Sequence, residues 1–166
     1  GRAGDGLVFL VDDDAAVLRA CEQTLRLADI KVSSFRSAES ALVALHEDLP
    51  AVIVSDVRMS GKSGIELLEE VQKQHRDLPV ILITGHGDVS MAVQAMRAHA
   101  YDFIEKPFNI DQLMVVVARA METSRLRREN QELRRRDVTS SDMVGSSLAF
   151  KTLKAKEAQW WIGGAY

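Results

Sequence analysis

Acidic residues stand at the ends of two apolar runs, and they are the positions in this sequence most suited to chemistry. Asp56 closes the run 51–55, and the run 7–11 is followed directly by three aspartates at 12–14. Short runs rich in β-branched residues and bounded by polar ones are typical of the buried central strands of a parallel sheet. Such sheets place their functional groups beyond the carboxyl ends of the strands. We therefore expect both acidic clusters to meet at one edge of a sheet.

Carboxylates gathered this closely repel one another unless a cation joins them. Oxygen ligands suit a hard cation, so Asp12, Asp13 and Asp56 together predict a Mg²⁺ site. Acids at strand ends also serve as helix caps, and Asp14 is explained by that role alone. Capping alone is a poor explanation for the other three.

Two further apolar runs bring other groups to the same edge. The run 80–83 ends at Thr84, and the run 102–105 ends at Lys106, which is followed by Pro107. A Lys-Pro pair directly after a strand indicates a fixed turn and is compatible with a cis peptide bond. The edge is then expected to hold acids, a hydroxyl and an ammonium group.

Strand and helix patterns alternate five times and must position these groups. A regular alternation with short connections predicts a doubly wound parallel sheet, because each parallel crossover needs a helix to return the chain. The expected fold is α/β and flavodoxin-like, with five strands in the order 2-1-3-4-5 and a C-terminal helical extension. The helices are expected at about 15–28, from a cap at Ser37 to about 47, from 64 to before 77, from a cap at Asp88 to 97, and from near Asp111.

The set of polar positions resembles the receiver domain of two-component response regulators, over about residues 7–121. The resemblance implies phosphoryl transfer to Asp56 from a sensor histidine kinase or a small phosphodonor. It also implies an aspartate pair, a switch hydroxyl, a lysine that pairs with the phosphoryl oxygens, and an aromatic switch; these are Asp12 with Asp13, Thr84, Lys106 and Phe103. By the same resemblance Asp13, Asp56 and the backbone carbonyl of Arg58 ligate Mg²⁺, and Asp12 holds metal-bound water.

Three segments narrow the resemblance to the sigma-54-dependent transcriptional activators of the nitrogen-regulation and dicarboxylate-transport type. They are residues 55–59, 84–88 and 101–108. One position departs from the family pattern, since the loop after the acceptor usually carries proline where this chain has Ser60. We expect that change to loosen a turn and to leave the chemistry alone.

The helical periodicity does not stop at the end of the receiver. We expect a receiver domain at 1–121, a linker helix that forms a coiled coil at 122–137, and at 138–166 a linker, the start of a truncated ATPase domain and an unassigned tail. The resemblance implies that the parent protein carries an ATPase domain and a DNA-binding domain beyond this chain.

A heptad pattern predicts a parallel homodimer. Opposite charges at two g-to-e pairs favour that alignment, and Asn130 at an a position would fix its register. The assignment places Val116, Thr123 and Asn130 at a, Leu126 and Leu133 at d, Glu122 and Glu129 at g, and Arg127 and Arg134 at e. The run is short, so a lone solvated helix stays open as an alternative.

Composition excludes several classes of protein. The longest apolar runs are too short to span a bilayer, no cleavage-site pattern is visible, and the single cysteine, Cys21, sits in a helical apolar pattern, so we expect a cytoplasmic protein. The net charge of −3 divides into +4 for residues 125–136 and −7 for the rest. Glutamates interleave with the arginines of that stretch, which favours a solvated helix face over nucleic-acid binding.

Two rival functions are each weakened by one residue, and a third is weakened by the whole set of polar positions. Gly61-Lys62-Ser63 has the form of the end of a phosphate-binding loop of a nucleotide-binding enzyme, but Asp56 stands where that motif requires glycine. A phosphatase that passes through an aspartyl phosphate needs a second acid two residues after its nucleophile, where this chain has Arg58. A passive dimerisation module is disfavoured because every reactive position is filled. We expect a phospho-acceptor that assists its own phosphorylation and dephosphorylation, and not an enzyme in the usual sense.

Overall fold

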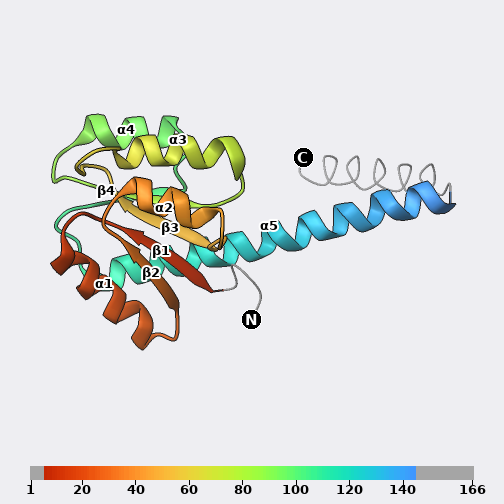
Figure 1. Ribbon diagram of the computed structural model, residues 1–166, viewed down its shortest axis with the longest axis horizontal. Helices are drawn as coiled ribbons and strands as arrows, with labels where there is room; N and C mark the ends of the chain where they lie inside the picture. The colour runs from red at the N-terminus through yellow and green to blue at the C-terminus, as the bar shows by residue number, and fades with distance from the viewer. Residues whose placement is uncertain (1–5, 145–166) are drawn as a thin grey trace, which may run out of the picture. The chain divides into compact units, whose positions relative to one another are not determined.

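A computed structural model describes residues 6–144, and their side chains as far as residue 134. Strands and helices alternate along these residues as expected (Figure 1). The elements are β1 Leu7–Val11, α1 Ala15–Leu27, β2 Lys31–Phe35, α2 Ala38–Leu45, β3 Val52–Asp56, α3 Gly64–Gln74, β4 Val80–Thr84, α4 Val89–Arg97, β5 Asp102–Glu105 and α5 Ile110–Val144.

The strands form one parallel sheet in the order β2-β1-β3-β4-β5. This is the predicted flavodoxin-like order, and it is confirmed. The helices α2, α3 and α4 cover one face of the sheet, and α1 and the first part of α5 cover the other (Figure 1). The strand β3 therefore lies at the centre, with Asp56 at its carboxyl end.

The apolar runs are continuous because both faces of the central strands are buried. Alternate residues of β1 and β3 point into two separate cores, so Val8 and Val54 pack beneath α1 and α5, whereas Phe9 and Ile53 pack beneath the other three helices. Every residue of β3 and β4 is buried. Burial on both faces makes these strand ends rigid supports for the side chains that follow them.

Side-chain caps fix where the helices begin after the carboxyl ends of the strands. Asp14 caps α1 and accepts a hydrogen bond from the backbone N of Ala16 at 3.0 Å. Ser37 and Asp88 cap α2 and α4, and Ser63 forms a reciprocal capping box at the start of α3. The loops at this edge are therefore held at their helical ends.

The first part of α5 packs against its own receiver and changes the heptad interpretation. Val116, expected at an a position, lies in the core beneath the sheet with 8% exposure. Thr123, the next a position, has its hydroxyl 3.3 Å from that of Tyr101. Both residues face their own chain because the helix uses the same stripe to pack against the receiver core and Tyr101. The d residues Leu126 and Leu133 are half-exposed, so they could still contact a second chain.

The helix α5 also runs on through residues 138–144, which the sequence pattern assigns to a linker. Those residues contain neither glycine nor proline, and the next glycine is Gly145, so no strong helix breaker precedes it. By internal contacts the chain divides into two units, Gly1–Leu126 and Arg127–Tyr166. The first two residues of the expected ATPase-like opening, Met143 and Val144, end α5, and the rest of that opening and the tail lie outside the described residues. Within residues 6–144, no helix combines the length and apolarity that a bilayer crossing needs.

Candidate functional site

The predicted polar residues lie at one edge of the sheet, at the carboxyl ends of β1, β3, β4 and β5. Val11 pairs with Ser55, so Asp12 and Asp56 leave neighbouring strands at the same level. Thr84 ends β4, and Lys106 directly follows β5. Asp12, Asp56 and Thr84 are all buried. The parallel register thus gathers residues that are far apart in the chain.

Lys106 and Asp56 form the closest charged pair in this region. The ammonium nitrogen Nζ of Lys106 lies 2.6 Å from Oδ2 of Asp56, and the backbone N of Arg58 donates to Oδ1 of Asp56 at 3.2 Å. Burial by itself would lower the pKa of Lys106, but the hydrogen bond and the charge of Asp56 outweigh it and raise that pKa. Lys106 therefore stays an ammonium at neutral pH. The peptide bond from Lys106 to Pro107 is cis.

Asp12 places an unsatisfied oxygen at the same edge. Its Oδ1 accepts from the backbone N of Asp14 at 2.9 Å, whereas its Oδ2 is buried and has no hydrogen-bond partner among the described residues. Burial raises the pKa of Asp12, and the neighbouring charge of Asp56 raises it further. An opposite charge supplied at this oxygen would stabilise the carboxylate.

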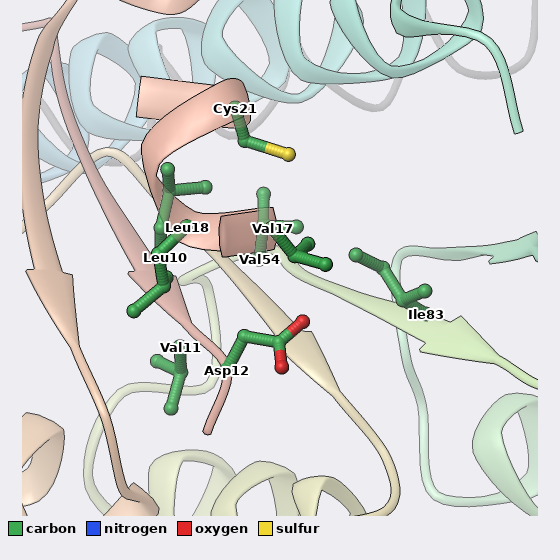
Figure 2. A pocket seen from close by; sticks show the side chains of 8 residues that line it. All are labelled: Leu10, Val11, Asp12, Val17, Leu18, Cys21, Val54 and Ile83. Carbon is green, nitrogen blue, oxygen red and sulfur yellow. The ribbon is translucent and has the colours of Figure 1, made fainter. Parts of the chain in front are cut away.

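Beneath Asp12 lies a small apolar pocket, with Asp12 at one end and Cys21 near the other (Figure 2). Its volume is about 10 Å³, which is no larger than a single water needs. The pocket is therefore too small for a cofactor. Any ligand of Asp12 must approach from the loops at the sheet edge.

The carboxylate of Asp13 is already bound by Ser60, on the loop after β3. Its Oδ2 accepts from the backbone N of Ser60 at 3.0 Å and lies 3.4 Å from the Ser60 hydroxyl oxygen. Among the described residues, no group of three or more His, Cys, Asp or Glu side chains is arranged so that it could hold a metal ion. The structure thus pairs Asp56 with Lys106, and it binds the side chain of Asp13, on the loop after β1, to Ser60 on the loop after β3.

The chemistry of these donors nevertheless suits a hard cation. Asp12 offers a buried oxygen without a partner in the part of the chain that the structure describes, Asp56 is the neighbouring carboxylate, and the backbone N of Arg58 donates to Asp56. Oxygen donors of this kind are those that Mg²⁺ takes in proteins. Asp13 follows Asp12 directly in the chain, and its side chain would have to leave Ser60 to take part.

Thr84 carries a second unsatisfied group. Its hydroxyl oxygen is buried and has no hydrogen-bond partner within the described part of the chain. The loop that follows Thr84 is held by Glu105, whose Oε2 accepts from the backbone N of Gly87 at 2.6 Å and lies 3.7 Å from Nδ1 of His86. The loop is thereby tied to the end of β5.

Glu105 and Asp88 are residues of this site that the sequence interpretation did not assign to it. Asp88 was expected only as a helix cap, but its Oδ2 also binds Nη2 of Arg58 at 2.9 Å, which joins the loops after β3 and β4. The hydrogen bond and charge of Arg58 lower the pKa of Asp88. The register of the sheet could have indicated Glu105, because it lies opposite Thr84 on the neighbouring strand.

Phe103 lies on β5 and is partly exposed. It lines a groove of about 510 Å³ against α4, together with Val89, Val93 and Met96. These three residues of α4 are all among the exposed large hydrophobic residues. An aromatic side chain in such a groove has room to change its position.

The polar groups of Lys62 and Ser63, in the loop 61–63, already have partners within the chain. The backbone N of Lys62 donates to Oε2 of Glu39 at 3.3 Å, and the Lys62 ammonium lies 3.9 Å from Glu70. Ser63 is occupied as the cap of α3. A carboxylate stands where a phosphate-binding loop would receive its ligand, which argues further against a nucleotide-binding enzyme.

Comparison with known proteins agrees with this geometry. Residues 8–118 match the model of the response regulator receiver domain. The chain is 48% identical over 151 residues to the C4-dicarboxylate transport transcriptional regulatory protein DctD of Pseudomonas aeruginosa, and 35% identical over 148 residues to the DNA-binding transcriptional regulator NtrC of Salmonella typhimurium. These matches cover 89% and 88% of this chain, but 33% and 31% of the relatives. The chain therefore spans about a third of their length.

A solved structure supports the same assignment. The crystal structure of the receiver domain of NtrX from Brucella abortus superposes with a TM-score of 0.67 at 39% identity, over 70% of this chain and 98% of that one. The predicted likeness to nitrogen-regulation and dicarboxylate-transport activators is confirmed by these relatives. The chain belongs to the response regulator receiver domain family.

Proposed function

We propose that Asp56 accepts a phosphoryl group from a phosphohistidine of a sensor histidine kinase, or from a small phosphodonor. The observation that carries this proposal is the Lys106 ammonium 2.6 Å from an oxygen of Asp56, beside two buried oxygens without partners on Asp12 and Thr84. A single strand end thus combines a nucleophilic carboxylate, a fixed cation and groups that await a ligand.

The transfer is a displacement at phosphorus. An oxygen of Asp56 forms the new bond to phosphorus, the bond to the donor nitrogen breaks, and the electron pair leaves with the imidazole. Charge spreads over the equatorial phosphoryl oxygens during this step, so positioning and neutralisation carry most of the catalysis. Lys106 is already held at the carboxylate and pairs with the phosphoryl oxygens after transfer. Hydrolysis of the acyl phosphate ends the signal.

Asp13, Asp56 and the backbone carbonyl of Arg58 would hold Mg²⁺ directly, and Asp12 would hold its bound water. The cation supplies neutralisation of the incoming phosphoryl oxygens. The unpartnered oxygen of Asp12 supports this assignment. The contact of Asp13 with Ser60 means that this side chain must turn before the set is complete.

The proposed conformational signal begins at Thr84. Its hydroxyl would bind the phosphoryl group and draw the loop after β4 inward, and the contact of Gly87 with Glu105 must then open. Phe103 would rotate into the vacated space. That movement changes the face made by α4, β5 and the first part of α5, where the exposed residues Val89, Val93 and Met96 lie.

The output is proposed to lie in parts of the parent protein that this chain does not contain. This chain covers about a third of the length of its relatives, which are transcriptional regulators, and the remaining length supports a sigma-54-dependent ATPase domain and a DNA-binding domain as downstream partners in the cytoplasm. We further propose a homodimer. Its seam is narrower than the heptads suggested, because among the assigned a and d positions, which all lie within the described residues, only Leu126, Asn130 and Leu133 are exposed.

Acetyl phosphate with Mg²⁺ tests the central step. Intact mass should show one added phosphoryl group that is labile at alkaline pH, and Asp56→Asn should abolish it. Asp14→Asn is the matched control, because Asp14 caps α1 by its side chain and has no role in the transfer. Labelling that persists in Asp56→Asn would refute the assignment of the acceptor.

A further inference from the structure

Ser60 makes two contacts with a carboxylate that the proposed chemistry requires. Its backbone N lies 3.0 Å from Oδ2 of Asp13, and its hydroxyl oxygen lies 3.4 Å from the same atom. The first distance is that of a good hydrogen bond, and the second is long. The backbone N–H is therefore the principal donor to Asp13.

Proline, the residue usual at this position in receivers, could make neither contact. Its ring replaces the N–H, and it has no hydroxyl. The serine was expected to change only the turn, but the structure gives it a direct link to the acidic edge. The departure from the family pattern thus reaches the site itself.

The contact decides where Asp13 lies. Of the three acids expected to gather around a cation, Asp56 is paired with Lys106, Asp12 has one oxygen without a partner among the described residues, and Asp13 is bound by Ser60. No metal-holding group of three such side chains is present among the described residues. Asp13 cannot complete the set from the conformation in which Ser60 holds it.

We propose that Ser60 is a positioning residue that competes with Mg²⁺ for Asp13. This inference rests on the proposed function, in which Asp13 is a ligand. In the resting chain the carboxylate is bound to the loop after β3, and the cation must release it. Only molecules with Asp13 released are competent to bind Mg²⁺. The apparent affinity for Mg²⁺ is therefore the intrinsic affinity multiplied by the fraction of such molecules.

The test is a calorimetric titration of the full chain with MgCl₂, in the wild type, Ser60→Pro and Ser60→Ala. A net hydrogen bond of ordinary strength corresponds to an affinity gain of about three- to tenfold in Ser60→Pro. Ser60→Ala is the matched control: it keeps the N–H and loses only the longer contact, so its gain should be clearly smaller. Affinity in Ser60→Pro that is equal to or weaker than that of the wild type overturns the proposal.

A measurement on the unmodified chain decides the matter if Ser60→Pro does not fold. The amide proton of Ser60 should lose its carboxylate acceptor when Mg²⁺ binds, so its resonance should move upfield and its exchange with solvent should accelerate at saturation. A Ser60 amide with unchanged exchange at saturating Mg²⁺ overturns the competition.

Asp13→Ala separates this inference from the function on which it rests. If the wild type binds Mg²⁺ and Asp13→Ala weakens that binding, the proposed ligand holds, and Ser60→Pro alone then decides the competition. In the Asp13→Ala background, Ser60→Pro should change the affinity no further. Wild-type affinity in Asp13→Ala would instead refute Asp13 as a ligand, and with it the competition, whereas Asp56 as the phospho-acceptor is tested separately by the labelling with acetyl phosphate.

Discussion

Gly64 offers the sharpest test of how the fold supports the acceptor. A Cβ atom at this position would lie 2.4 Å from the carbonyl oxygen of Asp56 and 2.9 Å from Cα of Val57. Gly64 is buried, and its backbone N donates to the carbonyl of Val57 at 2.9 Å. The start of α3 therefore rests directly on the strand end that carries Asp56, and only glycine fits between them.

The cost of Gly64→Ala follows from what the methyl group meets. Overpacking a core typically costs about 1–3 kcal/mol when side chains can shift. Here the opposing atoms are backbone, so we expect the upper end, about 3 kcal/mol, with about 1 kcal/mol of it from the weakened bond to Val57. The backbone of Asp56 must move, so the contact of Asp56 with Lys106 should be disturbed as well.

Urea unfolding of the wild type, Gly64→Ala and Gly85→Ala measures this effect. Gly85 is the matched control, because a Cβ there would meet nothing within 4 Å and its φ is not in the left-handed region. The control should change stability by no more than about 1 kcal/mol, with stabilisation expected from the less flexible unfolded chain. Equal free energies of unfolding for the two variants would refute the argument that α3 is seated on the strand end.

Three other perturbations test further contacts. Lys106→Met leaves the buried Asp56 carboxylate without its cation, and since the lysine side chain is more than a third exposed we expect a loss of about 1 kcal/mol; an unchanged melting temperature would contradict this. The raised Lys106 pKa makes that contribution complete at neutral pH, and it should disappear as the pH rises through that pKa. Cys21 is buried, and burial raises the pKa of its thiol, so a thiol reagent at pH 8 should label the native chain far more slowly than the urea-unfolded chain. Equal labelling rates would show that the thiol is not buried. Replacing both Leu126 and Leu133 by glutamate, or ending the chain at residue 122, should convert the dimer to a monomer in sedimentation if the exposed leucines form the dimer seam. An unchanged oligomeric state would leave this part of α5 as a solvated helix.

Features set by local pattern and parallel register could be predicted from the sequence. The continuous apolar runs require burial on both faces, and a parallel sheet then places Asp56, Lys106 and Thr84 at one edge whatever the details of packing. The caps Ser37 and Asp88 were predictable for a similar reason, since a cap acts within a few residues of its own position.

Features that depend on a choice between partners could not be predicted. The stripe containing Val116 and Thr123 satisfies both a coiled-coil seam and a helix packed on its own sheet, because the two periods differ little over a few turns. The conformation of Asp13 is another such choice. A carboxylate next to a possible cation site can also bind a backbone N–H, and only the structure shows that Ser60 supplies one.

The unsatisfied hydroxyl of Thr84 has a consequence for the evolution of this domain. A buried hydroxyl without a partner costs about 1–3 kcal/mol, and valine would occupy nearly the same volume without that cost. Selection for thermal stability alone would therefore replace Thr84, and directed evolution on heat resistance should recover valine there among its early solutions. If Thr84 binds the phosphoryl group as proposed, such a variant would be more stable and would no longer respond to phosphorylation. Under the proposed function, the threonine keeps this chain below its attainable stability at the position that binds the phosphoryl group.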